Sequence, residues 1–325
     1  MVALGGRKGL VGQKRVCLIQ PRHSWRTGYI YLPGSLLNLG SRLLAAGFTV
    51  EFLDLNIHSL DDGRTRAIVQ ASDFVGVNAL GSPYIPEIYD LIVELRQQGY
   101  RKPVLVGGEG VARLMKNDFR TLFPNEEVGD VRHVIDNGDL EEAFGLLLRR
   151  LPPKYEVSMR PMLERLPVWL QERYLTNEWC LFLSHGCAFG CDYCNAAKRE
   201  RERYRTFEGL RDEVGYIAKF LASRGHRNIW VYASNLDALQ NSESFESMLR
   251  VAHEAARAHG VQLHVRALAT TKLTARAHER DPKLLNRLRF LGLHTLAFGV
   301  DGVSETVWQT QHKLHNSITE YEISR

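Results

Sequence analysis

Long apolar runs, an N-terminal apolar leader and a strong excess of one charge are all missing from this sequence. No window of the 325 residues approaches the roughly 18 consecutive apolar residues of a membrane-spanning helix, which excludes an integral membrane protein. The stretch Met1–Arg15 is rich in glycine and basic residues, so we expect a flexible tail over 1–12 and no signal peptide. A net charge of +5 is too weak to predict nucleic-acid binding by itself.

Internal repeats and low-complexity stretches are also missing, and 44% apolar with 24% charged residues is typical of a globular protein. Cysteine is scarce, yet three of the five cysteines fall between Cys187 and Cys194. This grouping disfavours a disulfide framework and favours a reduced, cytoplasmic protein in which the cysteines serve metal or redox chemistry. The other two, Cys17 and Cys180, lie in apolar runs and are predicted to be small core residues.

Apolar, strand-like runs alternate with amphipathic segments through the first 150 residues. Strands are predicted at Val16–Gln20, Phe48–Leu53, Phe74–Val77, Pro103–Val106 and Val131–Ile135, and helices at Leu32–Ala46, Ile85–Gln98 and Leu140–Leu151. Near-continuously apolar strands separated by helices indicate a parallel sheet covered on both faces. The pattern predicts a flavodoxin-like doubly wound domain over 13–150, whose ligand would lie at the carboxyl ends of the strands.

A second alternation begins after an irregular, proline-containing segment at 151–178, which we expect to be a linker. Strands are predicted at Cys180–Ser184, Ile229–Ala233, Val261–Arg266 and Thr295–Val300, and helices at Phe207–Arg224, Phe245–His259, Pro282–Leu291 and from near Ser304. Four β/α units are too few for a closed eight-unit barrel. The sequence therefore predicts a partial, truncated β/α barrel over 179–325.

The three grouped cysteines, Cys187, Cys191 and Cys194, directly follow the first strand of this second domain. Thiolates at these spacings can converge on one metal centre if the loop folds round it, and glycines within the loop supply the backbone freedom. Three protein ligands would leave a coordination position open for a substrate or cofactor. Structural zinc is the alternative, because His185 could complete a site of three cysteines and one histidine, although zinc ligands usually come as two separated pairs.

The Cys-x₃-Cys-x₂-Cys spacing, with Tyr193 before the last cysteine, resembles that of the radical S-adenosylmethionine enzymes. The resemblance implies that the three cysteines hold a [4Fe–4S] cluster, whose fourth iron chelates the methionine moiety of S-adenosylmethionine. An electron delivered through a reductant such as flavodoxin or ferredoxin would then cleave the sulfonium to a 5′-deoxyadenosyl radical. The implied S-adenosylmethionine contacts are Tyr193, Ser234, Asn235 and Asp301. From the residues alone, Asp301 can also be a turn or helix-capping residue.

The first domain is similar to the cobalamin (vitamin B12)-binding domains that precede many radical enzymes. The similarity covers the segments 31–37, 45–50 and 54–56, the segment 78–80 in the place of a Ser-x-Leu element, and a matching Gly-Gly element. The implied cobalamin contacts are Pro33, Asn78, Leu80, Gly107 and Gly108. The glycine pair can also be read as a plain tight turn after a strand.

The Asp-x-His-x-x-Gly element of cobalamin domains is absent. His23 lies in the corresponding loop, but without the aspartate or the spacing. The resemblance therefore implies a cobalt without a histidine lower ligand, which suits methyl exchange. His23, His58 and His133 are each expected to be ordinary surface residues.

Basic residues with interleaved acids run from Lys198 to Arg205. This run can be a solvated, salt-bridged face, or a lip over the cluster that meets an acidic substrate or a cofactor carboxylate. Neither aromatic stacking platforms nor a recognisable RNA-binding module accompanies it, so no nucleic-acid partner is expected.

Together the resemblances predict a cobalamin-dependent radical S-adenosylmethionine enzyme that acts on a small-molecule substrate. Methyl transfer to an unactivated carbon or phosphorus is the expected reaction. Oxidative cyclisation or rearrangement, and a non-catalytic corrinoid- or iron–sulfur-binding subunit, stay open. The family's barrel commonly has six β/α units, so a truncated sequence, a partner that completes the barrel and a degenerate product are three explanations for the four units here.

Overall fold

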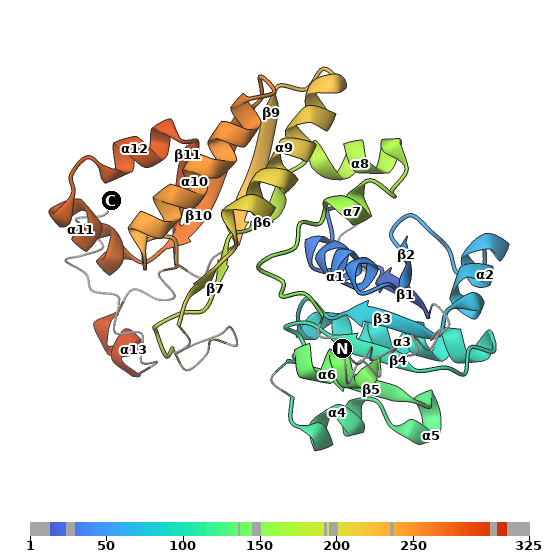
Figure 1. Cartoon of the computed structure of the whole chain (residues 1–325). Coiled ribbons are helices and arrows are strands. Elements are labelled where there is room, and N and C mark those ends of the chain that lie inside the picture. Colours follow the sequence, from blue (N-terminus) through green and yellow to red (C-terminus); the bar gives the residue numbers. More distant parts are fainter. Residues whose placement is uncertain are drawn as a thin grey trace, which may run out of the picture. The chain divides into compact units, whose positions relative to one another are not determined.

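The chain folds into two compact units (Figure 1). The computed structural model describes residues 14–23, 30–112, 114–135, 137–144, 151–191, 194, 201–234, 237–299 and 304–310. The first unit comprises residues 1–27 and 42–151, and the second comprises residues 28–41 and 152–325.

A five-stranded, fully parallel sheet forms the centre of the first unit, with strand order β2-β1-β3-β4-β5 (Figure 1). The strands are β1 (Arg15–Gln20), β2 (Thr49–Asp54), β3 (Phe74–Asn78), β4 (Val104–Gly107) and β5 (Val131–Val134). The helices are α1 (Gly34–Ala45), which spans the boundary of the two units, α2 (Gly63–Ala71), the 3₁₀ turn η1 (Ser82–Tyr84), α3 (Ile85–Gln97), α4 (Lys116–Leu122), α5 (Asn125–Val128) and α6 (Asn137–Ala143). This strand order confirms the predicted flavodoxin-like fold.

The second unit contains a four-stranded parallel sheet of order β11-β10-β9-β6 and a short antiparallel pair, β7–β8. The strands are β6 (Trp179–Phe182), β7 (Ser184–His185), β8 (Arg203–Tyr204), β9 (Asn228–Ser234), β10 (Gln262–Ala269) and β11 (Leu293–Phe298). The helices are α7 (Arg160–Leu163), α8 (Val168–Leu175), α9 (Phe207–Ser223), α10 (Ser242–Arg257), α11 (Thr271–Arg280), α12 (Leu284–Phe290) and α13 (Glu305–Thr310). Four parallel strands joined through helices confirm the predicted partial barrel.

Buried and exposed residues alternate along the strands of this second sheet, and the alternation shows which face is covered. In β10 every second residue is buried, and α10 packs against this strand beside α9 (Figure 1). The same alternation holds in β6, where Trp179 and Leu181 are buried and Cys180 is exposed. The prediction that Cys180 is a core residue is therefore wrong, because its side chain leaves the opposite face of the strand. Cys17, in the fully covered first sheet, is buried as predicted.

Helices α7 and α8 occupy part of the segment 151–178 that we expected to be irregular. Pro161 lies in the first turn of α7, and Pro167 is the residue immediately before α8. Proline is well tolerated at a helix start because the first backbone N–H groups have no intrahelical partner. Two prolines that suggested a break in the chain therefore begin helices instead.

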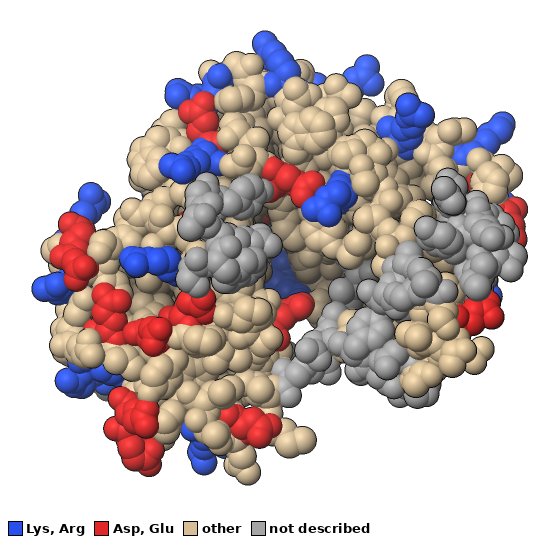
Figure 2. Space-filling model, turned by 180° about the vertical axis from the view of Figure 1, so that it is seen from behind, with Lys and Arg blue, Asp and Glu red and all other residues tan. Residues whose placement is uncertain are grey.

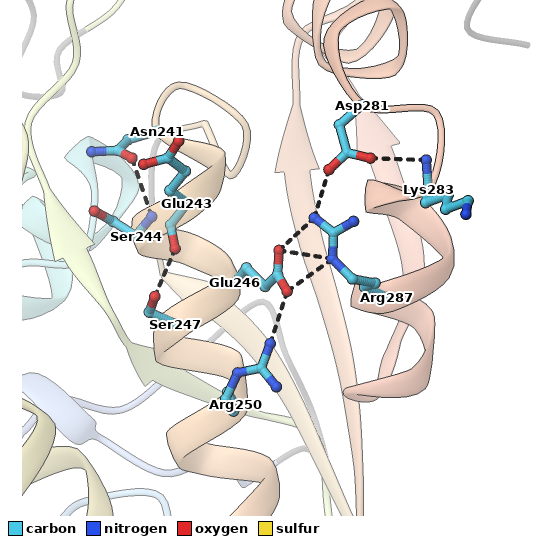
Figure 3. A network of polar contacts seen from close by, with 9 residues as sticks. All are labelled: Asn241, Glu243, Ser244, Glu246, Ser247, Arg250, Asp281, Lys283 and Arg287. Atoms are coloured by element: carbon cyan, nitrogen blue, oxygen red, sulfur yellow. Dashed lines mark hydrogen bonds and ion pairs between the residues drawn. The ribbon is translucent and has the colours of Figure 1, made fainter.

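An exposed ion-pair network joins α10 to α12 (Figure 3). Arg287 donates to both carboxylate oxygens of Glu246 at 2.9–3.2 Å, and to Asp281 at 2.7 Å. Arg250 donates to the same Glu246 at 2.9 Å. The Arg250, Arg287 and Asp281 side chains are 42–54% exposed, so water weakens these ion pairs and the network contributes little to the free energy of unfolding.

Lys and Arg side chains lie singly or in small groups among acidic and uncharged side chains on the face shown in Figure 2. The described part of that face carries no continuous basic surface, in keeping with the weak net charge. None of the described helices has the length and apolar character that crossing a membrane requires.

Candidate functional site

The cysteine loop lies between the two strands of the pair β7–β8 in the second unit. Ser184 pairs with Tyr204 and His185 with Arg203, so both ends of the loop are held together. Gly186 has φ +109°, and a Cβ there would lie 2.6 Å from the carbonyl oxygen of Arg201. Only glycine fits this close approach without a backbone shift. The first residue of the loop is thus fixed by the fold.

Cys187 and Cys194 are half-buried and Cys191 is buried. Burial raises the pKa of the Cys187 thiol to about 11, and the negative charges of Asp237, Cys191 and Cys194 add to this, against the backbone N–H of Phe189, which lowers it. The three cysteines therefore share one electrostatic neighbourhood.

A cysteine that acts as a free nucleophile has the opposite shift, a lowered pKa in positive surroundings. Grouped thiols in negative surroundings suit a cation, which deprotonates the thiols it binds. In kind and number the donors fit an iron–sulfur cluster. The structure does not bring the three thiols to within the distance of one metal ion, since no three His, Cys, Asp or Glu side chains of the described residues, these cysteines included, form such a group.

Asp237, which the sequence did not single out as a site residue, is the buried acid beside this loop. It is 1% exposed, and its two carboxylate oxygens accept from the backbone N–H groups of Leu239 and Thr270, each at 2.9 Å. Burial raises its pKa to about 6, and nearby Glu202 also raises it, against the hydrogen bonds, which lower it. Asp237 thereby ties the connection after β9 to the connection after β10.

A second polar cluster joins the two flanks of the cysteine loop. The hydroxyl of Ser184 donates to Glu202 Oε1 at 2.6 Å, and Gln240 Nε2 donates to Glu202 Oε2 at 3.1 Å. Gln240 Oε1 accepts from the backbone N–H of Ala188 at 2.7 Å. The sequence signal for Glu202 was only the charged run, and Gln240 had none.

Arg205, at the end of that charged run, is 3% exposed, so the reading of the run as a solvated face is wrong at this position. Its guanidinium donates to both oxygens of Glu213 at 2.6 and 2.8 Å. Glu213 also accepts from the backbone N–H of Met159 at 2.7 Å. The pair is enclosed because the side chains meet between α7 and α9, which anchors the chain just after β8.

The predicted S-adenosylmethionine contacts are only partly among the described residues. Ser234 is the last residue of β9, half-buried, and pairs with Phe182 of β6. Its position at a carboxyl end is the one expected. Tyr193, Asn235 and Asp301 lie outside the described residues.

In the first unit, β1 and β3 are adjacent, so the chain leaves the sheet centre in opposite directions from this point. Such a switch point is where open parallel sheets bind ligands. The loops beside it are tied together, since Asn56 Oδ1 accepts from the backbone N–H of His23 at 2.9 Å and Asp54 Oδ1 accepts from Asn56 at 2.7 and 2.9 Å.

Four predicted cobalamin contacts lie at this carboxyl edge. Asn78 ends β3, and Leu80, two residues on, is 39% exposed. Gly107 ends β4, and Gly108 has φ +100°. A Cβ on Gly108 would lie 2.2 Å from Asn78 Oδ1 and 2.5 Å from the Ala79 carbonyl oxygen. Glycine is thus required at 108 by the packing of two loops on each other.

Pro33, the fifth predicted contact, belongs to the second unit. It is buried, and its carbonyl oxygen accepts from the backbone N–H groups of Leu36 and Leu37 at 3.0 and 3.1 Å. Its observed contacts therefore begin helix α1.

The expectation that three histidines are surface residues is wrong for His23, which is 5% exposed. Its ring packs edge-on against Tyr84 with centroids 4.9 Å apart, and its Nε2 lies 3.3 Å from Gln20 Nε2. His133 stacks on Phe119 at 4.3 Å, and His58 is half-buried against the backbone of Asp54. All three are engaged in the packing of the first unit.

A cavity of about 750 Å³ lies elsewhere, between α7, α9 and α10 of the second unit. Its walls include Arg160, Tyr216 and Lys219 and none of the candidate residues above. The chemistry-bearing groups and this cavity are separate features of the unit.

Comparison with solved structures identifies the fold. The chain is similar to the cobalamin-dependent S-adenosylmethionine radical enzyme OxsB with aqua-cobalamin and S-adenosylmethionine bound, at 14% identity and a TM-score of 0.70. The fold is that of OxsB. The structures of OxsB with aqua-cobalamin bound and of apo, selenomethionine-labelled OxsB give TM-scores of 0.69 and 0.66 at 15% identity.

Each of these similarities covers 96% of this chain and 47% of the OxsB chain, so this chain spans about half the length of OxsB. The resemblance inferred from the cysteine spacing is thereby confirmed at the level of the fold. No protein-family model and no curated protein sequence matches the chain.

Proposed function

We propose that this chain is a cobalamin-dependent radical S-adenosylmethionine enzyme acting on a small-molecule substrate, with methyl transfer to an unactivated carbon or phosphorus as its reaction. The observation that carries the proposal is the three-cysteine loop at the carboxyl end of β6, in a fold shared with OxsB. When bound, the cluster supplies the electron that cleaves the sulfonium of S-adenosylmethionine, and cobalamin supplies the methyl group.

In the second unit, Cys187, Cys191 and Cys194 would hold the cluster. Asp237 places negative charge beside Cys187, which favours a cationic ligand such as the sulfonium compound. Glu202 adds negative charge near Asp237. Ser234 would offer its hydroxyl to the same ligand from the end of β9. The hydrogen bonds accepted by the buried Asp237 carboxylate would hold the connections after β9 and β10 in place while the ligand binds.

In the first unit, Asn78, Leu80, Gly107 and Gly108 would line the cobalamin site. The exposed Leu80 side chain gives an apolar surface at the switch point, and the close-packed loop at Gly108 keeps that edge rigid. His23 is turned against Tyr84 and Gln20, which supports a cobalt without a histidine ligand.

The test is anaerobic reconstitution of the whole chain with iron and sulfide, followed by dithionite and S-adenosylmethionine. We expect a brown protein that forms 5′-deoxyadenosine, and loss of both properties in Cys191→Ser. Cys180→Ser is the matched control, because this cysteine is exposed on β6 outside the loop and its replacement should change neither. A colourless protein with one zinc ion bound by the same cysteines would overturn the proposal.

Cobalamin binding is tested separately by titration with hydroxocobalamin. A ligand that binds only the folded state raises the melting temperature by mass action. Corrinoid binding without 5′-deoxyadenosine formation would instead indicate a carrier subunit. Methylation of a candidate substrate, followed by mass spectrometry, distinguishes methyl transfer from cyclisation or rearrangement.

A further inference from the structure

The Ala188 backbone amide, next to the first cysteine, is held from a distant part of the chain. Its N–H donates to Gln240 Oε1 at 2.7 Å, across 52 residues of sequence. Gln240 follows β9 and immediately precedes the capping residue of α10, Asn241, so its backbone belongs to a well-anchored turn. An exposed amide of the cysteine loop is thus hydrogen-bonded by a side chain from the turn that precedes α10.

Glu202 holds Gln240 in the orientation that this contact needs. Gln240 Nε2 donates to Glu202 Oε2 at 3.1 Å, which leaves Gln240 Oε1 directed to Ala188. Ser184, which is 3% exposed, donates to the other oxygen of Glu202 at 2.6 Å. These contacts form a hydrogen-bonding relay from Ser184 of β7 through Glu202 and Gln240 to the backbone amide of Ala188, next to Cys187.

The consequence reaches the first cysteine itself. The backbone N–H of Phe189 hydrogen-bonds to the Cys187 thiol, while the N–H of the residue between them is taken by Gln240. With the Ala188 amide fixed, the next peptide is oriented toward the sulfur. Hydrogen bonds to ligand sulfurs and the orientation of metal ligands control how tightly a cluster is held.

We infer that Gln240 and Glu202 are a positioning pair that pre-forms the first turn of the cysteine loop for cluster binding. This inference rests on the proposed function for the identity of the bound group. The hydrogen-bonding relay can be tested without that group, because it exists in the apo chain.

The first experiment is hydrogen–deuterium exchange of the apo, full-length chain, followed on a peptide that contains residues 186–190. Gln240→Leu removes the acceptor, and exchange at Ala188 should become roughly 3- to 10-fold faster, the range expected for one hydrogen bond. Gln240→Glu places two carboxylates side by side, and it should also loosen the loop.

The decisive variant exchanges the two groups. In the Glu202→Gln, Gln240→Glu double variant, an amide at 202 can donate to a carboxylate at 240, which still accepts from Ala188. Exchange should return to within about twofold of wild type, since the coupling of two contacting residues is recovered when both change together. A residue that only fills space would show no such recovery.

The second experiment measures loss of iron from the reconstituted chain to an excess of a chelator. Gln240→Glu should lose iron roughly 3- to 10-fold faster than wild type, and the double variant should be restored. Gln171→Leu is the matched control, because Gln171 also bridges two partners, Leu166 and Tyr216, but near α8 and α9. It should lower the melting temperature and leave iron loss unchanged.

Wild-type exchange at Ala188 in Gln240→Leu overturns the inference. If Gln240→Leu does not fold, a double variant no closer to wild type than Gln240→Glu overturns it equally. A wild-type chain that takes up no iron–sulfur cluster contradicts the proposed function instead. The exchange experiment then still decides whether the pair holds the loop.

Discussion

The carboxyl edges of the two sheets are held together in different ways. In the first unit, the loops after β3 and β4 touch through backbone and small side chains, and Gly108 leaves no room for a Cβ. In the second unit, the connections after β6, β9 and β10 are joined by polar side chains, among them Glu202, Asp237 and Gln240. The contact at Gly108 involves no titratable group, whereas the contacts of Glu202 and Asp237 depend on charge and burial.

The largest effect is expected from the enclosed ion pair of the second unit. Glu213→Ala leaves the buried Arg205 guanidinium without its counter-charge, and this should lower the free energy of unfolding by about 3–5 kcal/mol. Urea denaturation of the whole chain provides the measurement. The Arg205→Met, Glu213→Leu double variant should recover much of the loss, because apolar side chains replace both charges; no recovery would mean that the pair's geometry matters more than its charge.

Gly108→Ala tests the backbone-held edge of the first unit. The positive φ and the 2.5 Å approach to the Ala79 carbonyl oxygen should together lower the free energy of unfolding by about 3 kcal/mol. Gly63→Ala, where a Cβ meets nothing within 4 Å, is the control and should change little. Equal melting temperatures for the two variants would show that the loop can shift without cost.

Asp237 makes the second edge pH-dependent. Its folded-state pKa of about 6 lies above the ordinary value of 3.8, so between these pH values the folded chain keeps a proton that the unfolded chain releases. Stability from this group is therefore present below about pH 4 and is lost as pH rises through 6, by about 2–3 kcal/mol.

Asp237→Asn removes the titration and leaves one backbone N–H without its acceptor. The difference in unfolding free energy between wild type and variant should therefore be larger at pH 4.5 than at pH 7, measured by urea denaturation at each pH. A difference that is constant across this range would contradict a proton held by Asp237.

The smallest effect is expected for the ion pairs that join α10 to α12, in which the arginine and aspartate side chains are exposed. Arg287→Ala removes the link between α10 and α12 in Figure 3, and it should lower the free energy of unfolding by less than about 1 kcal/mol. Raising the salt concentration should reduce even this difference. If Arg287→Ala lowered the free energy of unfolding as much as Glu213→Ala does, burial would not be what decides the strength of these ion pairs.

Most strands could be predicted from the sequence because apolar runs report burial directly. Helices α7 and α8 could not, since their prolines lie where a helix tolerates them, and short helices such as α2 are begun by a single capping contact from Asp62 to Thr65. The three cysteines could be singled out as candidates because their spacing is local. The hydrogen bonds of the site leave no local pattern in the sequence, because their partners are far apart along the chain. Asp237 and Thr270 are 33 residues apart, and Ala188 and Gln240 are 52 residues apart.

The pairing of β7 with β8 fixes where the cysteine-bearing segment leaves and re-enters the second unit. For a chain segment whose ends are already joined, ligation of a metal removes less conformational freedom than it would from an open chain. The buried Arg205 next to this junction anchors the returning end whether or not iron is present. We therefore expect that iron can be removed and added back reversibly while the protein stays folded.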